Sequence, residues 1–369
     1  MSLLEYARHA GKIFLRRHAF PPYFLFFITA RCDCRCKHCF FWKSTNQKPD
    51  ELSTNEIEKI SASMDNLLQL TLTGGDAAKR EDLPEIAQIF HRNNHVKNIT
   101  IGTNGSMADL VVKQSRQMLD KCRGMNLTVD LSIDGIGADH DEIRRRPGLF
   151  EEVTATAREL LKLSRTRPAL NVCIDITMSH FNEDRIAEIY RYVRDEIKPH
   201  IINLLLIRGE PREPEAKEVD VAHYERVNDM LRKDVERGLM RGYDFLTDTL
   251  NAKDILLRDI IIRTSRQDRY QMPCTAGTLT GVLYPEGGVA PCEMVDDRFG
   301  NVRDYDYDMK AIWRSKAAVE YREKIRREKC YCIHQCFLSN NILFNPKYYP
   351  KLLAEILRIK IGRMRAAKQ

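Results

Sequence analysis

The stretch Cys32-Asp33-Cys34-Arg35-Cys36-Lys37-His38-Cys39 directly follows the apolar run Tyr23–Thr29 and its short extension. Read as Cys32, Cys36 and Cys39, it has the spacing C-x3-C-x2-C. Three thiolates on one short loop can bind three irons of a [4Fe–4S] cluster, because soft sulfur ligands suit iron–sulfur clusters. The fourth iron then has no protein ligand, and an open metal position is a place for chemistry.

A zinc site is the alternative for this loop. Structural zinc has four protein ligands, and Cys34 is available as the fourth. A zinc-binding interaction protein would be colourless when purified without oxygen. An iron–sulfur electron carrier or sensor is a second alternative, and it would not release 5′-deoxyadenosine from S-adenosylmethionine (SAM).

The loop and its place after an apolar strand resemble those of the radical SAM enzymes. His38 stands just before the third cysteine, where that family often has an aromatic residue. The resemblance implies that Cys32, Cys36 and Cys39 bind the catalytic cluster and that its open iron binds the methionine part of SAM. Reductive cleavage of SAM would then give a 5′-deoxyadenosyl radical, which abstracts a hydrogen from substrate.

The composition is that of an ordinary soluble globular protein. The chain has 369 residues, of which 43% are hydrophobic and 30% charged, enough for one large domain and a smaller one. Its apolar runs are all shorter than the roughly 20 residues that span a bilayer. Eleven cysteines without a secretory signal favour a reducing compartment, and we expect a cytoplasmic location with no nucleic-acid partner.

Strand-like runs alternate with helical patterns, which predicts βα units around a parallel sheet. The six runs are Phe24–Thr29, Leu70–Thr73, Asn98–Ile101, Leu127–Ile133, Asn171–Met178 and Ile201–Ile207. We therefore expect the α/β class, and the resemblance implies a partial (β/α)6 TIM barrel with a small C-terminal cysteine-rich domain. The expected divisions are an N-terminal basic amphipathic helix (1–20), the barrel (21–215), a helical linker and barrel completion (216–270), an auxiliary-cluster domain (271–340) and a C-terminal basic amphipathic helix (341–369).

Polar or glycine-containing segments follow the strands at their carboxyl ends, where such barrels build their sites. Gly74-Gly75-Asp76 stands where the family usually has Gly-Gly-Glu, a motif that binds the amino group of SAM. The resemblance also implies SAM contacts from Thr103, Asn104, Ser132, Asp134 and Arg208. An ordinary turn is the alternative interpretation of each segment, because glycine and Asx turns are common.

A second cysteine group lies near the C-terminus. The spacing Cys274-x12-Gly287-x4-Cys292 resembles the opening of the SPASM and twitch auxiliary-cluster domains. In those domains a hairpin carries the ligands, and we expect it here across Leu279–Tyr284 and Val289–Pro291. Five cysteines allow one four-ligand cluster but not two. The expected ligands are Cys274, Cys292, Cys332 and Cys336, with Cys330 as the alternative to Cys332, and a structural zinc knot remains open.

The sequence does not identify the catalytic group; Asp175, His180 and Tyr284 are the candidates for a base or hydrogen donor. We expect two [4Fe–4S] clusters and SAM as cofactors and a flavodoxin- or ferredoxin-like electron donor. The preferred activity is oxidation or coupling of a small anionic, sugar-like or lipid-linked substrate. Modification of a peptide or protein is the alternative.

The two ends of the chain carry its basic charge. Residues 1–20 contain four basic residues and one acidic, and residues 341–369 contain seven and one, whereas the whole chain has a net charge of +7. Apolar residues recur at helical spacing in both segments, which is typical of helices that lie on anionic membranes. The alternative is that both helices pack against the barrel and expose their basic side chains to solvent. The sequence supports this alternative at least as well as contact with a membrane surface.

Overall fold

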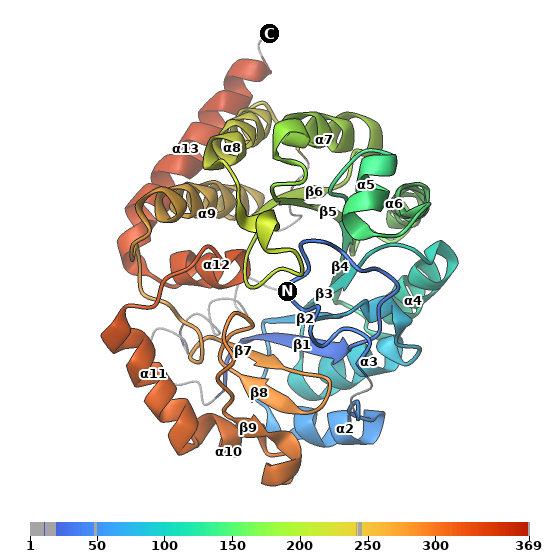
Figure 1. The fold of residues 1–369 in the computed structure, drawn as a ribbon, viewed down its shortest axis with the longest axis vertical. Coiled ribbons are helices and arrows are strands. Elements are labelled where there is room, and N and C mark those ends of the chain that lie inside the picture. Colours follow the sequence, from blue (N-terminus) through green and yellow to red (C-terminus); the bar gives the residue numbers. More distant parts are fainter. Residues whose placement is uncertain (1–10, 12–19, 48–49, 241, 243–245, 368–369) are drawn as a thin grey trace.

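The computed structural model describes residues 11, 20–47, 50–240, 242 and 246–367. Among them, nine strands form one sheet in the order β6-β5-β4-β3-β2-β1-β7-β8-β9 (Figure 1). Neighbouring strands from β6 to β1 are parallel, which confirms the expected α/β partial barrel. The expected N-terminal helix at 1–20 falls almost entirely outside the described residues.

The six parallel strands match the expected runs to within two residues at each end. Their bounds are β1 (Tyr23–Thr29), β2 (Gln69–Gly74), β3 (Asn98–Thr103), β4 (Asn126–Ser132), β5 (Leu170–Met178) and β6 (Ile201–Leu206). In β2, β3 and β4 buried apolar residues alternate with partly exposed polar ones. In these three strands one face is therefore apolar beneath the helices, and the other, the inner face, is polar.

The helices that connect the strands cover the apolar face. They are α2 (Thr54–Ser63), α3 (Leu83–Asn94), α4 (Ala108–Lys121), α5 (Ala138–Arg144), α6 (Leu149–Ser164) and α7 (Ile186–Tyr192). At the start of α2, Ser53 and Glu56 form a capping box, which satisfies backbone N–H groups of the first turn. The helical segment after β6 holds α8 (Val221–Glu236) and α9 (Thr247–Gln267).

The C-terminal hairpin extends the barrel sheet. It consists of β7 (Thr280–Leu283) and β8 (Gly288–Ala290), followed by β9 (Gly300–Asn301). β7 pairs in parallel with β1 from Tyr23↔Thr280 to Phe26↔Leu283. The expected hairpin is thus present, and its pairing with β1 joins the cysteine-rich unit rigidly to the barrel.

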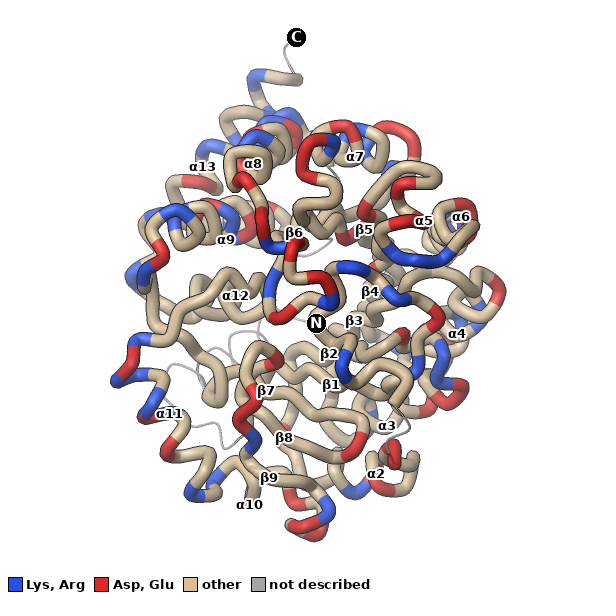
Figure 2. Tube along the Cα trace, viewed as in Figure 1, with Lys and Arg blue, Asp and Glu red and all other residues tan. Residues whose placement is uncertain are grey.

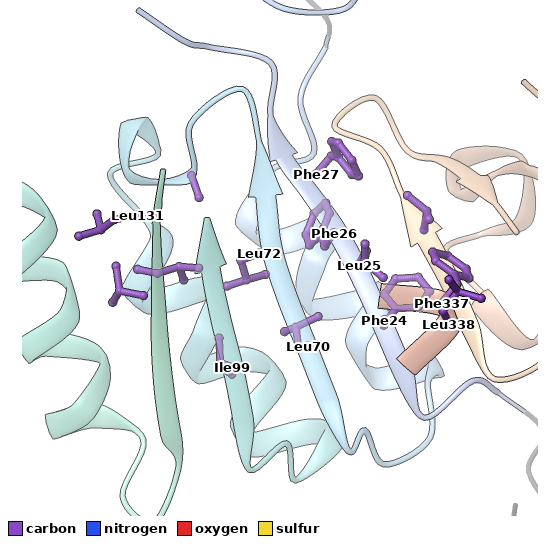
Figure 3. Packing of buried hydrophobic residues seen from close by; sticks show 14 of the residues in the cluster. Phe24, Leu25, Phe26, Phe27, Leu70, Leu72, Ile99, Leu131, Phe337 and Leu338 are labelled. Carbon is purple, nitrogen blue, oxygen red and sulfur yellow. The ribbon is translucent and has the colours of Figure 1, made fainter. Parts of the chain in front are cut away.

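Four further helices complete the chain: α10 (Met309–Arg314), α11 (Lys316–Glu328), α12 (Gln335–Leu343) and α13 (Tyr349–Ala366). In Figure 1, α12 lies between α9 and β7, where the partial barrel has no strand. Figure 3 shows Phe337 and Leu338 of α12 beside Phe24 and Leu25 of β1. None of the helices in the described part of the chain has both the length and the apolar character needed to cross a bilayer.

Candidate metal centres and active site

The loop after β1 brings its cysteine thiols together. Cys34 hydrogen-bonds with the thiols of both Cys32 and Cys36, and the backbone N–H of Cys34 donates to Cys32 Sγ at 3.4 Å. The bond from Cys34 lowers the pKa of Cys36. Burial, followed by the nearby charges of Cys36 and Cys32, raises the pKa of Cys39 to about 12. The three thiols expected to bind the catalytic cluster are therefore neighbours.

Asp33, inside the same loop, is held by cations. Its carboxylate lies 3.4 Å from Lys79 Nζ and 3.2 Å from Arg146 Nε, and it accepts a hydrogen bond from Ser106 Oγ. These three contacts hold the Asp33 carboxylate in place. A carboxylate oxygen of Asp33 also lies within 4.8 Å of the sulfur atoms of Cys32 and Cys34.

A buried ion pair lies behind the cysteine loop. Arg144 of α5 contacts Asp134 Oδ2 through Nη2 at 2.6 Å and Nε at 2.8 Å, while His38 Nε2 is 3.4 Å from the same oxygen. Burial raises the pKa of Asp134, but the charges of Arg144, His38 and His140 and the hydrogen bond from the Thr177 N–H together outweigh it, and the pKa is lowered. The backbone N–H groups of Arg35 and Lys37 donate to the carbonyls of Arg144 and Ile143, so α5 fixes the loop.

The Gly-Gly-Asp segment after β2 packs directly against the loop after β1. A Cβ atom on Gly75 would lie 2.4 Å from the carbonyl oxygen of Arg31, so only glycine permits this approach. The carboxylate of Asp76 is buried and accepts the backbone N–H groups of Ala78 at 3.0 Å and Asn104 at 3.2 Å. Asp76 therefore ties together the loops after β2 and β3, a role additional to the expected SAM contact.

The other residues expected near SAM lie at the same edge of the sheet. Asn104 Nδ2 donates to Cys34 Sγ at 3.1 Å and to Asp33 Oδ1 at 2.7 Å, and Thr103 Oγ1 accepts from the backbone N–H of Gly105. Ser132 ends β4. The fold thus brings the loops after β1, β2, β3 and β4 together, whereas contact of Gly74, Gly75, Asp76, Thr103, Asn104, Ser132 and Asp134 with SAM stays a prediction.

A polar cluster on the inner face was missed by the sequence analysis. Oxygen and sulfur atoms of Asp130 (β4), Cys173 and Asp175 (β5) lie within 4.8 Å of one another, and Asn203 (β6) donates to Asp175 at 2.9 Å. Burial and then the charge of Asp175 raise the pKa of Asp130. Burial also raises the pKa of Asp175. The sequence offered one signal for this cluster: Cys173 and Asp175 are two positions apart in an otherwise apolar strand and therefore share one face of it.

The three catalytic candidates have different surroundings. Asp175 belongs to the inner-face cluster. His180 is exposed beyond β5, with Nδ1 3.4 Å from Glu183 and 3.1 Å from the carbonyl of Glu218. Tyr284 is buried and stacks on Phe27 with ring centroids 5.2 Å apart. Among the candidates, Asp175 has the partly exposed, inward-facing position that a base for a bound substrate needs.

Arg208, after β6, connects the barrel to the C-terminal hairpin. Its Nη2 lies 3.4 Å from Glu293 Oε1, and its guanidinium is 5.2 Å from the ring centroid of Phe40. Glu293 in turn faces His334 Nε2 at 2.7 Å, and both are buried. The expected contact of Arg208 with SAM stays a prediction; the sequence analysis had assigned no role to Glu293 or His334.

Four C-terminal cysteines form the auxiliary group. The thiols of Cys274 and Cys330 hydrogen-bond to each other. Burial raises the pKa of Cys292, and nearby charges of Cys332 and Cys330 add to it. Backbone N–H groups of Ala276, Met294 and His334 donate to Cys274, Cys292 and Cys332, at 3.4, 3.4 and 3.3 Å. N–H···S bonds stabilise thiolate ligands, so this donor set fits an iron–sulfur cluster.

Cys336 has a different environment. It is exposed, and Cys330 is the cysteine that hydrogen-bonds to Cys274. Cys330 is therefore a further candidate ligand beside Cys274, Cys292 and Cys332. The expected ligation by Cys336 stays a prediction.

Two parts of the chain match known families. Residues 26–193 match the radical SAM superfamily, and residues 274–337 match SPASM, an iron–sulfur cluster-binding domain. This chain belongs to the radical SAM superfamily. It is a radical SAM enzyme with a SPASM domain, and two iron–sulfur clusters and SAM are its cofactors. When bound, the first cluster would allow one-electron cleavage of SAM, and the second cluster would provide a further redox centre.

Relatives of this radical SAM protein act in different pathways. The antilisterial bacteriocin subtilosin biosynthesis protein AlbA of Bacillus subtilis is 25% identical over 353 residues, covering 90% of this chain and 70% of AlbA. The AdoMet-dependent heme synthase of Oleidesulfovibrio alaskensis is 26% identical over 325 residues, covering 82% and 76%. The solved structure of anSMEcpe with bound AdoMet has a TM-score of 0.60 at 14% identity, covering 95% and 98%, which supports the fold.

Proposed function

We propose that this radical SAM enzyme oxidises or cross-links a side chain of a peptide or protein substrate. The substrate lies on the inner face, beside Asp130, Cys173, Asp175 and Asn203. This proposal takes the alternative from the sequence in place of the preferred small anionic, sugar-like or lipid-linked substrate. The electron for SAM cleavage comes from a flavodoxin- or ferredoxin-like donor.

The inner-face cluster is the observation that carries this choice. Two carboxylates and a thiol within 4.8 Å supply no positive charge that would bind the carboxylates or phosphates of a substrate. Arg208, the nearby cation, is 3.4 Å from buried Glu293 and 17% exposed, which offsets its attraction for an anion. Amide and amine groups of a peptide can donate hydrogen bonds to these acceptors. The similarity to AlbA along 90% of the chain supports the same class.

The reaction balances as a two-electron oxidation. A substrate C–H bond gives its hydrogen atom to the adenosyl radical, which leaves as 5′-deoxyadenosine. A second substrate atom, such as a thiol sulfur, bonds to that carbon and gives its proton to Asp175. The auxiliary cluster, when bound, would accept the remaining electron. Burial raises the pKa of Asp175, which makes its carboxylate a better proton acceptor than an exposed one.

Anaerobically reconstituted protein with dithionite and SAM tests the enzyme class. We expect 5′-deoxyadenosine from the wild type and none from the Cys32→Ala, Cys36→Ala or Cys39→Ala variants. Absence of 5′-deoxyadenosine from fully loaded wild type would contradict the class.

The substrate class is tested with a deuterated cell extract, separated into peptides and small molecules. We expect the peptide fraction to stimulate 5′-deoxyadenosine formation, to transfer deuterium into it, and to lose both effects after protease digestion. Asp175→Asn should keep basal SAM cleavage and lose substrate modification, whereas His180→Gln should keep both. Stimulation by the protease-resistant fraction instead would reject a peptide substrate.

A further inference from the structure

Helix α13 is attached to the barrel through one side only. Leu352 and Ile359 are buried on that side, where α13 packs along α9 and α8. Arg232 of α8 contacts the buried Glu355 at 2.9 Å. Near the end of α13, Arg363 Nη1 lies 2.6 Å from Asp248 of α9. The helix therefore has a fixed orientation, and its opposite side is a defined surface.

That opposite side carries a row of exposed apolar residues, here called the α13 row. Leu353, Leu357, Ile361 and Met364 are 61%, 60%, 43% and 59% exposed. At 3.6 residues per turn, these four side chains fall within about 80° around the helix axis. The row is about 16 Å long at 1.5 Å per residue. Exposed large apolar residues in a contiguous row indicate an interaction surface.

Basic residues border the α13 row on both sides. Lys360 lies about 20° beyond one edge, and Arg365, Arg358 and Lys351 lie about 40° to 80° beyond the other. All four are exposed, and Figure 2 shows basic residues along α13. Glu355, the single acidic residue between Tyr349 and Ala366, is buried and pairs with Arg232 of α8 and, at 3.2 Å, with Arg358. The exposed side therefore combines apolar and positive character without a negative charge of its own.

We propose that the α13 row binds the surface of an anionic phospholipid bilayer, with α13 lying in the membrane plane. The apolar row enters the boundary between headgroups and acyl chains, and the bordering Lys and Arg side chains extend to the lipid phosphates. Charge complementarity selects lipid over a protein groove. The basic residues follow both edges of the row, as a uniformly negative plane requires, whereas a protein groove offers negative groups at particular points.

Sedimentation of the full-length reconstituted protein with vesicles tests this proposal. We expect binding to phosphatidylglycerol vesicles, weak binding to pure phosphatidylcholine vesicles, and loss of binding at high salt. Leu353→Ser with Leu357→Ser should weaken binding at least about tenfold. Lys360→Glu with Arg365→Glu should weaken binding to phosphatidylglycerol. The matched control is Val319→Ser, which alters a residue 41% exposed on α11 and should bind as the wild type does.

Three outcomes would overturn the proposal. The first is no binding of the wild type to phosphatidylglycerol vesicles, and the second is equal binding of the wild type and the Leu353→Ser, Leu357→Ser variant. The third is a wild-type dimer in light scattering that this variant abolishes, because the row would then be an interface between two copies. The basal SAM cleavage and the melting temperature of each variant should equal those of the wild type, so failure here is separate from failure of the proposed function.

Discussion

Replacing Arg144 with methionine removes the cation that faces Asp134, and Asp134 is fully buried. Arg144→Met breaks the contacts at 2.6 and 2.8 Å, leaving His38 Nε2 at 3.4 Å from the same oxygen and the Thr177 N–H at 2.8 Å on the other. Each hydrogen bond to a charged group contributes about 1.5–3 kcal/mol, and removing one partner of a buried pair costs about 3–5 kcal/mol. We therefore expect the free energy of unfolding to fall by about 3–5 kcal/mol.

Urea unfolding of the cluster-free protein, followed by far-ultraviolet circular dichroism, measures this loss. The neighbouring Arg145→Met is the matched control, because Arg145 pairs with Glu213 at the surface and is 48% exposed. Its cost should be no more than about 1 kcal/mol. In the double variant Asp134→Asn, Arg144→Met both charges are gone, and most of the lost stability should return.

The loss should also depend on pH. In the wild type the pKa of Asp134 is lowered, so its pair stabilises the fold above the unfolded pKa of about 3.9 and is lost as pH falls through the folded pKa. In Arg144→Met, the strongest of the charges that lower the pKa of Asp134 is gone, so this pKa rises. The cost of the substitution should therefore shrink on acidification, as Asp134 becomes protonated. A cost equal to that of Arg145→Met, or one independent of pH, would refute the reasoning.

Three further predictions concern the other parts of the site. Cys330→Ser should lower the iron content by about four atoms per chain, while the matched Cys336→Ser should keep it. The reverse result would assign the ligand role to Cys336 instead of Cys330. Asp130→Asn should raise urea stability at pH 7, because burial and Asp175 raise the pKa of Asp130 and make its ionised form unfavourable; the gain should vanish below about pH 4, and a loss at pH 7 would contradict it. Gly75→Ala should displace the loop after β1 and lower 5′-deoxyadenosine formation at least about tenfold, since its Cβ would collide with a backbone oxygen at 2.4 Å; unchanged SAM cleavage would exclude this requirement.

The strands and the two cysteine groups were predictable because their signals are local. The apolar runs from Phe24–Thr29 to Ile201–Ile207 end in glycine or polar turns. A strand can therefore be predicted from a segment of about six residues. The spacing from Cys32 to Cys39 and from Cys274 to Cys292 is also a property of short segments. The family, the partial barrel and the hairpin all followed from such patterns.

The tertiary structure decided what depends on register and side-chain direction. β7 pairs with β1 across more than 250 residues of chain, which no local pattern encodes. The same pairing rules place Asp130, Asp175 and Asn203 side by side, since a shift of one residue would turn each to the other face.

The ionic partner of Asp134 and the thiol that contacts Cys274 also depend on the tertiary structure. Asp134, expected near SAM, faces Arg144 because α5 brings that cation behind the cysteine loop. Cys330 hydrogen-bonds to Cys274, while Cys336, six residues further, is exposed in the first turn of α12. Sequence alone therefore determined which chemistry this chain carries, because metal-ligand spacing is local. Only the fold decided which acids, cations and thiols meet, because their proximity arises from strand register and helix packing.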